Sequence, residues 1–318
     1  MTPDLPLDPA VKFGVITGMP APAAVLATVE LLERHGFDSL WVGDHVAFPQ
    51  PILDPLLQLA QAAACARTLH FGTGVFLLPL RHPVLVAKQV ATLDLLCAGR
   101  LTFGVGVGGE FPREDEACGV PLRERGARLS EAIPLLRRLW SGEPVAHEGR
   151  FHRFAEVRLL PRPAQPGGPP IVCGGRNPAA LARIARMGDG WISYVVTPEM
   201  YGDGLDAIAR EAQVAGRHFA RFASAHLVFA RIDDGYERAL DVATEQLSRR
   251  YAMDFRKAAA RYAALGRPAD VAERLAAFAK SGVRHFVLDP IGPPAERDAQ
   301  IERFAREVRP LLGAHGLV

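Results

Sequence analysis

The stretch HFGTGVFLLPLRHPVLVAKQVATLDLLCAGRLTFGVGVGG, residues 70–109, predicts a strand, a helix and a second strand in succession. The two short apolar strands are expected at His70–Leu78 and Leu101–Gly108. Between them, one helical face carries the apolar residues Val86, Val90, Leu93 and Cys97. Gly99 then gives the helix a normal C-terminal stop. Two strands joined by a helical crossover are expected to run parallel in one sheet.

The same unit of a short apolar strand followed by an amphipathic helix recurs along the chain. Further strands are predicted at Lys12–Thr17, Ser39–Asp44, Pro170–Gly175, Gly190–Val196, Ala223–Ile232 and His285–Gly292. Eight strands that alternate with about eight helices match a closed (β/α)8 TIM barrel. An open, doubly wound parallel sheet is the alternative.

One segment interrupts this alternation. Residues Ser141–Pro170 are rich in Pro and Gly and contain GRFHRF and EVRLLPRP, which look like two strands of a hairpin. We interpret this segment, about 141–170, as a hairpin insertion after the fourth helix. The remainder is expected to form a single domain that covers residues 1–318.

Composition excludes several classes of protein. A net charge of +2 over 318 residues gives no electrostatic reason to expect nucleic acid or an anionic membrane. No apolar run approaches the roughly 18 residues that span a bilayer, and MTPDLPLDPA lacks the features of a signal peptide. The scattered cysteines argue against a disulfide framework or a thiolate metal site and fit a reducing cytoplasm; they are Cys65, Cys97, Cys118 and Cys173.

Two titratable residues, Asp44 and His45, follow directly on a strand in SLWVGDHVAFP, residues 39–49. In a TIM barrel, active residues lie at the C-terminal ends of strands. Histidine titrates near neutrality and can accept or donate a proton during a reaction. The alternative is a structural histidine at a strand end, with Asp44 capping the next turn.

Two glycine-rich stretches lie in the third and fourth predicted strands. In GTGVFLLP, residues 72–79, the glycines indicate a bulge or a close backbone approach, either to a flat ligand or through tight packing alone. GVGVGG, residues 104–109, fits G-x-G-x-x-G, but Pro112 delays the helix that a dinucleotide site requires. We therefore favour a barrel strand whose small residues, Gly106 among them, leave room in the lumen.

The stretch CGGRNP, residues 173–178, ends a strand in two glycines and begins a helix with Asn177 as N-cap and Pro178 at the first position. Exposed backbone N–H groups and the positive helix end form an anion site, to which Arg176 adds a charge. An ordinary glycine turn with a capped helix is the alternative. With no H-E-x-x-H and no carboxylate cluster, no metal site is expected.

Four stretches together resemble the bacterial luciferase-like oxidoreductase superfamily: GFDSLWVGDHVAFP, the stretch from GTGVFLLP to GVGVGG at residues 72–109, PPIVCGGRNPAALARIARMGDGWI and GRPADVAERLAAFAKSGVRHFVLD. The run H-P-x-x-x-A-K-x-x-A-T-L-D, residues 82–94, is highly characteristic. The resemblance implies a (β/α)8 barrel with an isoalloxazine-type ring at its C-terminal mouth. Asp44 and His45 would lie beside the reactive edge of the ring, and Gly74 and Val75 would form a supporting bulge with a cis peptide. The cofactor phosphate would be held by Gly174, Gly175, Arg176 and Asn177.

The G-D-H spelling resembles the branch that uses the deazaflavin coenzyme F420, whereas FMN-dependent members more often have a glutamate there. The expected function is hydride transfer between F420 and a small organic substrate, with His45 as base and Asp44 orienting it. The alternative is an FMN-dependent luciferase-like monooxygenase that uses molecular oxygen. A barrel that binds a ligand without catalysis is disfavoured by the titratable pair at its mouth.

The resemblance carries two further expectations. A homodimer is expected to pack the helices Asp54–Thr68 and Val84–Ala98. Cations that follow strand ends could meet the acidic F420 tail; these are Arg81, His82, Arg113 and Arg176. The chain departs from some relatives at Gly108 and Gly109, where a polar or large side chain is common, and Glu110 is a possible replacement.

Overall fold

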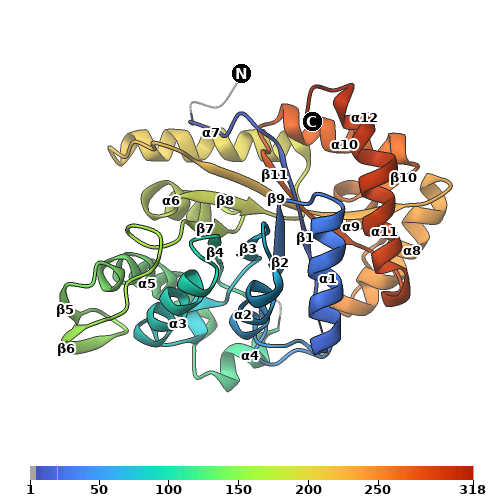
Figure 1. Cartoon of the computed structure of the whole chain (residues 1–318). Coiled ribbons are helices and arrows are strands. Elements are labelled where there is room, and N and C mark those ends of the chain that lie inside the picture. The colour runs from blue at the N-terminus through green and yellow to red at the C-terminus, as the bar shows by residue number, and fades with distance from the viewer. Residues whose placement is uncertain (1–4, 20, 110, 318) are drawn as a thin grey trace.

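The computed structural model describes residues 5–19, 21–109 and 111–317 and contains a closed barrel of parallel strands surrounded by helices (Figure 1). The barrel strands are β1 (Lys12–Ile16), β2 (Ser39–Val42), β3 (His70–Thr73), β4 (Leu101–Val105), β7 (Ile171–Gly174), β8 (Gly190–Ser193), β9 (Ala223–Ile232) and β11 (His285–Pro290). Each strand pairs with its neighbours along this series, and pairings of β8 with β9 and of β11 with β1 close the circle. The closure confirms the TIM barrel and excludes the open, doubly wound sheet.

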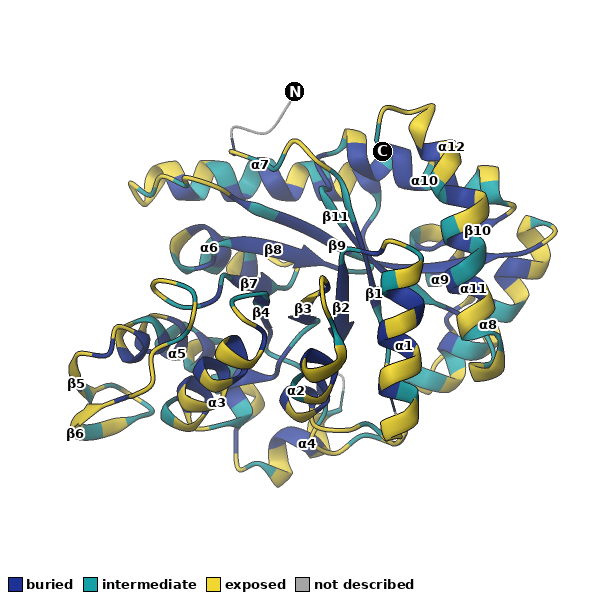
Figure 2. Cartoon of the chain, viewed as in Figure 1, coloured by how far each residue is buried: buried dark blue, intermediate teal, exposed yellow. Residues whose placement is uncertain are grey.

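The helices pack one face against the barrel and expose the other, as Figure 2 shows. They are α1 (Pro22–Arg34), α2 (Pro55–Cys65), α3 (Pro83–Leu96), α4 (Pro112–Ala117), α5 (Arg125–Trp140), α6 (Pro178–Met187), α7 (Pro198–Val214), α8 (Tyr236–Tyr251), α9 (Arg256–Tyr262), α10 (Pro268–Lys280), α11 (Arg297–Arg303) and α12 (Arg309–Gly313). As predicted, Asp54 caps α2 and Asn177 caps α6, each followed by proline at the first helical position. A short strand, β10 (Ala264–Gly266), pairs outside the barrel with β9 and was not predicted.

The lumen of the barrel has a small apolar core of its own, formed by Trp41, Val172, Ile192, Ala225 and Val287. Below it, the indole N–H of Trp41 donates to Ser39 Oγ at 2.8 Å, and Ser39 Oγ lies 2.7 Å from Nε2 of His285. Burial lowers the pKa of His285 to about 3, so the ring is neutral and Nε2 can accept from the serine hydroxyl. His285 is thus a structural residue of the barrel interior.

The insertion forms an antiparallel hairpin, β5 (Pro144–Glu148) with β6 (Arg153–Arg158), that projects from the barrel beside α5 (Figure 1). GRFHRF and EVRLLPRP were predicted to form the two strands of this hairpin. GRFHRF instead contains the turn, so both strands begin earlier in the chain than predicted. Glu131 on α5 explains this turn, since its carboxylate accepts the backbone N–H groups of Phe151 and His152 at 3.1 and 3.0 Å. The sequence of the hairpin alone does not indicate this contact, because Glu131 belongs to the preceding helix.

Several strands are shorter than predicted. The third was expected to reach Leu78, but β3 ends at Thr73 and the chain continues through a cis peptide between Gly74 and Val75. Phe76 then makes an isolated bridge to Val105 of β4. The apolar run therefore consists of a barrel strand and a buried connection, which periodicity does not distinguish.

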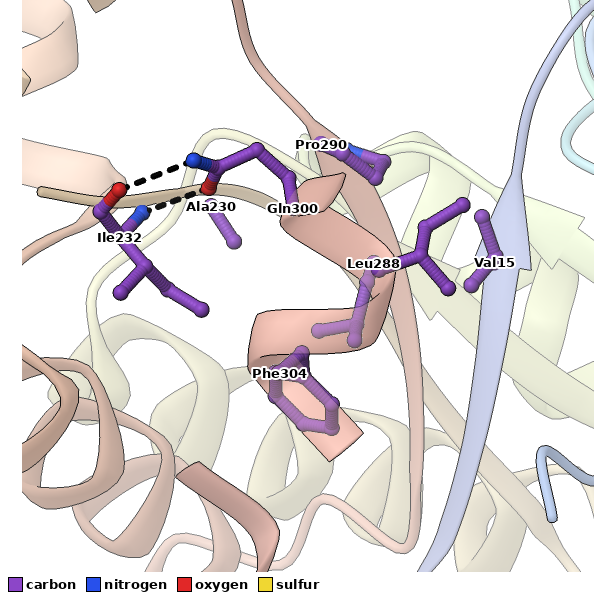
Figure 3. Close-up of a pocket in the computed structure, with 8 residues that line it drawn as sticks. Val15, Ala230, Ile232, Leu288, Pro290, Gln300 and Phe304 are labelled. Atoms are coloured by element: carbon purple, nitrogen blue, oxygen red, sulfur yellow. Dashed lines mark hydrogen bonds between the residues drawn. The ribbon is translucent and has the colours of Figure 1, made fainter. Parts of the chain in front are cut away.

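A side chain from α11 binds the C-terminal end of β9, as Figure 3 shows. Gln300 accepts the backbone N–H of Ile232 and donates to its carbonyl, both at 2.9 Å. The small cavity beside it is lined mainly by apolar residues such as Val15, Leu288 and Phe304. Its volume of about 10 Å³ is the space of roughly one water molecule, so it cannot hold a cofactor.

Candidate functional site

The predicted site residues lie at or just after the C-terminal ends of different barrel strands. Val75, directly after β3, contacts positions on two other strands. A methyl group built on Gly174 of β7 would lie 3.2 Å from Val75 Cγ1, and one built on Gly106 would overlap Val75 Cγ2. The structure therefore joins Val75, Gly106 and Gly174 in one surface.

This packing changes the interpretation of Gly106. We predicted that the glycines of the fourth strand leave open room in the lumen, but the space beside Gly106 is occupied by the Val75 side chain. Glycine is required there because a β-carbon would overlap a branched neighbour. The expected cis peptide between Gly74 and Val75 is confirmed.

Asp44 is buried and bound to an arginine. Its two carboxylate oxygens accept from the Arg81 guanidinium at 2.6 and 2.8 Å, and Oδ2 also accepts the backbone N–H of Leu77 at 2.8 Å. Burial raises the pKa of Asp44, while Arg81 and the Leu77 amide act in the opposite direction. The prediction that Asp44 orients His45 is wrong, since its carboxylate is committed to Arg81 and to the loop after β3.

His45 is oriented by a different carboxylate. Its Nδ1 lies 3.1 Å from Oε2 of Glu114, and its side chain is 19% exposed. One face of the imidazole stacks on Phe48 with ring centroids 4.1 Å apart, and Phe111 meets it edge-on at 5.5 Å. Among the residues that the structure describes, none forms a hydrogen bond with Nε2 of His45.

The sequence pattern did not indicate a role for Glu114. It lies on α4, within the stretch EFPREDEACG that was expected to delay the next helix, and its side chain is 2% exposed. Oε1 accepts the backbone N–H groups of Val46 and Ala47. The only signal was an acidic run on a short segment, and such a run is usually solvated.

The loop between β7 and α6 has the donor set expected for an anion. Gly175 has a φ of +119°, and a β-carbon there would lie 2.6 Å from that of Ala180. Asn177 accepts the Ala180 N–H at 2.8 Å, which orders the first turn of α6. The Arg176 side chain is exposed, and within the described ranges no carboxylate lies at ion-pair distance from it. A phosphate fits this helix end and its arginine.

The chain matches the luciferase-like monooxygenase family over residues 8–308. It belongs to that family. An F420-dependent glucose-6-phosphate dehydrogenase of Beutenbergia cavernae is 31% identical over 92% of this chain and 94% of its own length. The monooxygenase RslO1 from Streptomyces bottropensis is 28% identical, with a TM-score of 0.81 over 94% of this chain and 99% of that one. An F420-dependent secondary alcohol dehydrogenase in complex with an F420-acetone adduct shares the fold, at 20% identity and a TM-score of 0.83, over 95% of this chain and 99% of its own.

This luciferase-like protein is therefore an oxidoreductase with an F420-dependent relative. Of the cations expected near an acidic tail, Arg81 is paired with Asp44, and the ring of His82 accepts the Val84 N–H at 3.3 Å. Arg113 and Arg176 are exposed. The prediction that cations at the barrel mouth meet the acidic tail of F420 therefore rests on Arg113 and Arg176.

The loop after β4 contains the two glycines that were expected to replace a polar or large side chain. Gly108 and Gly109 have φ angles of +64° and +106°, which favour glycine, and the Arg125 guanidinium packs against Gly109. Glu110, the suggested replacement contact, lies outside the described residues.

In the described part of the chain, no cluster of three metal-ligating side chains forms. None of the helices in that part is both long and apolar enough to cross a bilayer.

Proposed function

We propose that this protein transfers hydride between coenzyme F420 and a small organic substrate at the mouth of the barrel. The observation that carries the proposal is His45, which follows β2. Its Nδ1 is engaged by Glu114, and Nε2 has no hydrogen-bond partner among the described residues. The F420-dependent glucose-6-phosphate dehydrogenase at 31% identity supports the choice of cofactor.

Residues of three strands would hold the cofactor. The surface formed by Val75 between Gly106 and Gly174 would support the ring, since it is continuous and largely apolar. Gly175, Arg176 and Asn177 would bind the phosphodiester through backbone N–H groups and the arginine charge. When bound, the deazaflavin supplies a carbon centre that accepts or donates hydride.

The protein's own contribution to the reaction is proton transfer. When an alcohol is oxidised, hydride leaves the carbon and the hydroxyl proton moves to Nε2 of His45, which yields a carbonyl product. In the reverse direction the protonated ring donates that proton. Asp44 and Arg81 hold the loop after β2 against the loop after β3 and take no part in the transfer.

The decisive experiment is fluorescence titration of the apo-protein with F420 and with FMN. F420 is expected to bind more tightly, and its affinity should fall with added salt because ions screen the acidic tail from Arg113 and Arg176. Tight, stoichiometric FMN binding without F420 binding would replace this function with the alternative.

That alternative is an FMN-dependent monooxygenase that uses molecular oxygen. It is supported by the family description and by the 28% identity to RslO1. FMN ends at a single phosphate and needs only the Gly174–Asn177 loop, so it would bind with a weaker dependence on Arg113.

His45→Ala tests the proton acceptor. The rate of hydride transfer is expected to fall by about 10²–10⁴-fold, because a general base contributes that much, while F420 affinity changes little. If the variant transferred hydride at the wild-type rate, His45 would be a structural histidine at a strand end and not the proton acceptor.

We also propose a homodimer whose interface is formed by α2 and α3. Both helices expose leucines, with Leu57 73%, Leu85 65% and Leu96 58% exposed. An apolar face of this kind is typical of a protein–protein contact. Light scattering at micromolar concentration should give twice the 34.4 kDa chain mass, and Leu57→Glu with Leu85→Glu should give the monomer mass.

A further inference from the structure

Within the described part of the chain, the hydrogen bonds of the Glu114 carboxylate go to three consecutive residues after β2, His45, Val46 and Ala47. Oε2 faces Nδ1 of His45, and Oε1 accepts the N–H groups of Val46 and Ala47. Since the side chain is 2% exposed, water competes little for these bonds. α4 thus presents a buried carboxylate to the loop that carries His45.

We propose that Glu114 is the positioning residue that fixes the tautomer of His45, an inference that rests on the proposed role of His45 as proton acceptor. An ionised carboxylate only accepts hydrogen bonds, so the nitrogen that faces it carries the hydrogen. Nδ1 is therefore the N–H of the neutral ring, and Nε2 keeps the lone pair. A neutral imidazole with the opposite tautomer could not take the substrate's proton through Nε2.

The aromatic neighbours hold the ring in the same orientation. Phe48 stacks on one face at an interplanar angle of 15°, and Phe111 stands nearly perpendicular at 89°. Turning the ring over would direct a carbon at Glu114 and lose the bond to the carboxylate. After proton uptake, the buried carboxylate compensates the charge of the imidazolium.

Glu114→Gln is the sharpest variant, because it preserves shape and reverses the hydrogen-bond pattern. The backbone N–H groups of Val46 and Ala47 are fixed donors, so the glutamine carbonyl must face them. Its NH₂ group then points at Nδ1 of His45 and donates to it, which places the hydrogen on Nε2. The variant should fold and bind F420 like the wild type while His45 has the wrong tautomer.

A chemical probe can test this without a substrate. Diethyl pyrocarbonate acylates an unprotonated imidazole nitrogen, and peptide mass spectrometry resolves each histidine. Modification of His45 in the apo-protein should slow by about tenfold in Glu114→Gln, since a hydrogen bond to a charged group is lost. The exposed His218 should react at an unchanged rate. Glu116→Gln, which removes the same charge from an exposed position of α4, should leave His45 reactive. Equal His45 modification in wild type and Glu114→Gln would overturn the proposal.

A second measurement needs no change at position 114. In ¹⁵N-histidine-labelled wild-type protein, the resonances absent from His45→Ala belong to His45. They should show hydrogen on Nδ1 and a free lone pair on Nε2, and hydrogen on Nε2 would overturn the proposal even if Glu114→Gln failed to fold. Failure of the proposed function has a different signature: His45→Ala would transfer hydride at the wild-type rate while both tautomer measurements gave the expected result.

Discussion

The Asp44 carboxylate is bound in a two-pronged ion pair by Arg81, at 2.6 and 2.8 Å, and does not contact its neighbour His45. The Asp44 side chain is fully buried, and the Arg81 guanidinium also lies 4.2 Å from the centre of the Phe76 ring. The pair therefore joins the loops after β2 and β3 at the mouth of the barrel.

Arg81→Met should destabilise the protein strongly, because it leaves a buried carboxylate without its partner. Such a change costs about 3–5 kcal/mol of unfolding free energy. Urea denaturation measures the loss, and the exposed Arg113→Met is the control, expected within about 0.5 kcal/mol of wild type. Adding Asp44→Asn to Arg81→Met should recover part of the stability. A double variant less stable than Arg81→Met would mean that the buried charge is not the cause.

The cysteines should differ in reactivity according to burial. Burial raises the pKa of both Cys97 and Cys173 to about 12, so neither forms a thiolate at pH 8. Cys65 is exposed. Iodoacetamide at pH 8 should alkylate Cys65 in the native protein and reach Cys97 and Cys173 only after denaturation. Labelling of native Cys173 as fast as Cys65 would contradict the close packing of β7.

Stability should decline as the pH falls below about 6.5. Burial lowers the pKa of His226 and of His285 to about 3 in the folded protein, whereas an unfolded histidine titrates near 6.5. Below that pH the unfolded chain binds more protons, so each histidine should cost about 2 kcal/mol between pH 7 and pH 5. Urea denaturation of His285→Gln, whose amide oxygen can still accept from Ser39, should show a smaller pH dependence than wild type. His218→Gln, which changes an exposed histidine, should have the same pH dependence of stability as the wild type.

Local patterns predicted the barrel well because each strand and helix carries its own signal. Asp54 and Asn177 are helix caps recognisable from the sequence, and both form the predicted bonds. The partners of the site residues depend on contacts between distant segments. Asp44 adjoins His45 in sequence but binds Arg81, while Glu114 reaches His45 from another helix. The resemblance supplied the cis peptide at Gly74, which no propensity indicates.

Arg176→Glu should weaken F420 binding, because it replaces a cation at the N-terminus of α6 with an anion beside the proposed phosphate position. Helix-end charges contribute roughly 0.3–1 kcal/mol each at exposed sites, so a charge reversal should raise the Kd several-fold. Calorimetry measures this directly. The exposed Arg186→Glu, at the other end of α6, is the matched control. An unchanged affinity in Arg176→Glu would remove the arginine from the site.

The glycine at position 106 offers a test of the surface on which the cofactor ring would lie. In Gly106→Ala the new methyl group would overlap Cγ2 of Val75, and overpacking of this kind costs about 1–3 kcal/mol. Val75→Ala removes the overlapping methyl group, so Gly106→Ala combined with Val75→Ala should cost less than the sum of the two single changes. Gly18→Ala is the control, since a β-carbon there meets no atom within 4 Å. Thermal unfolding of the wild type, the two single variants and the double variant gives the coupling energy. Additive costs would show that Gly106 and Val75 do not pack as described, and the proposed support for the ring would then lack its central contact.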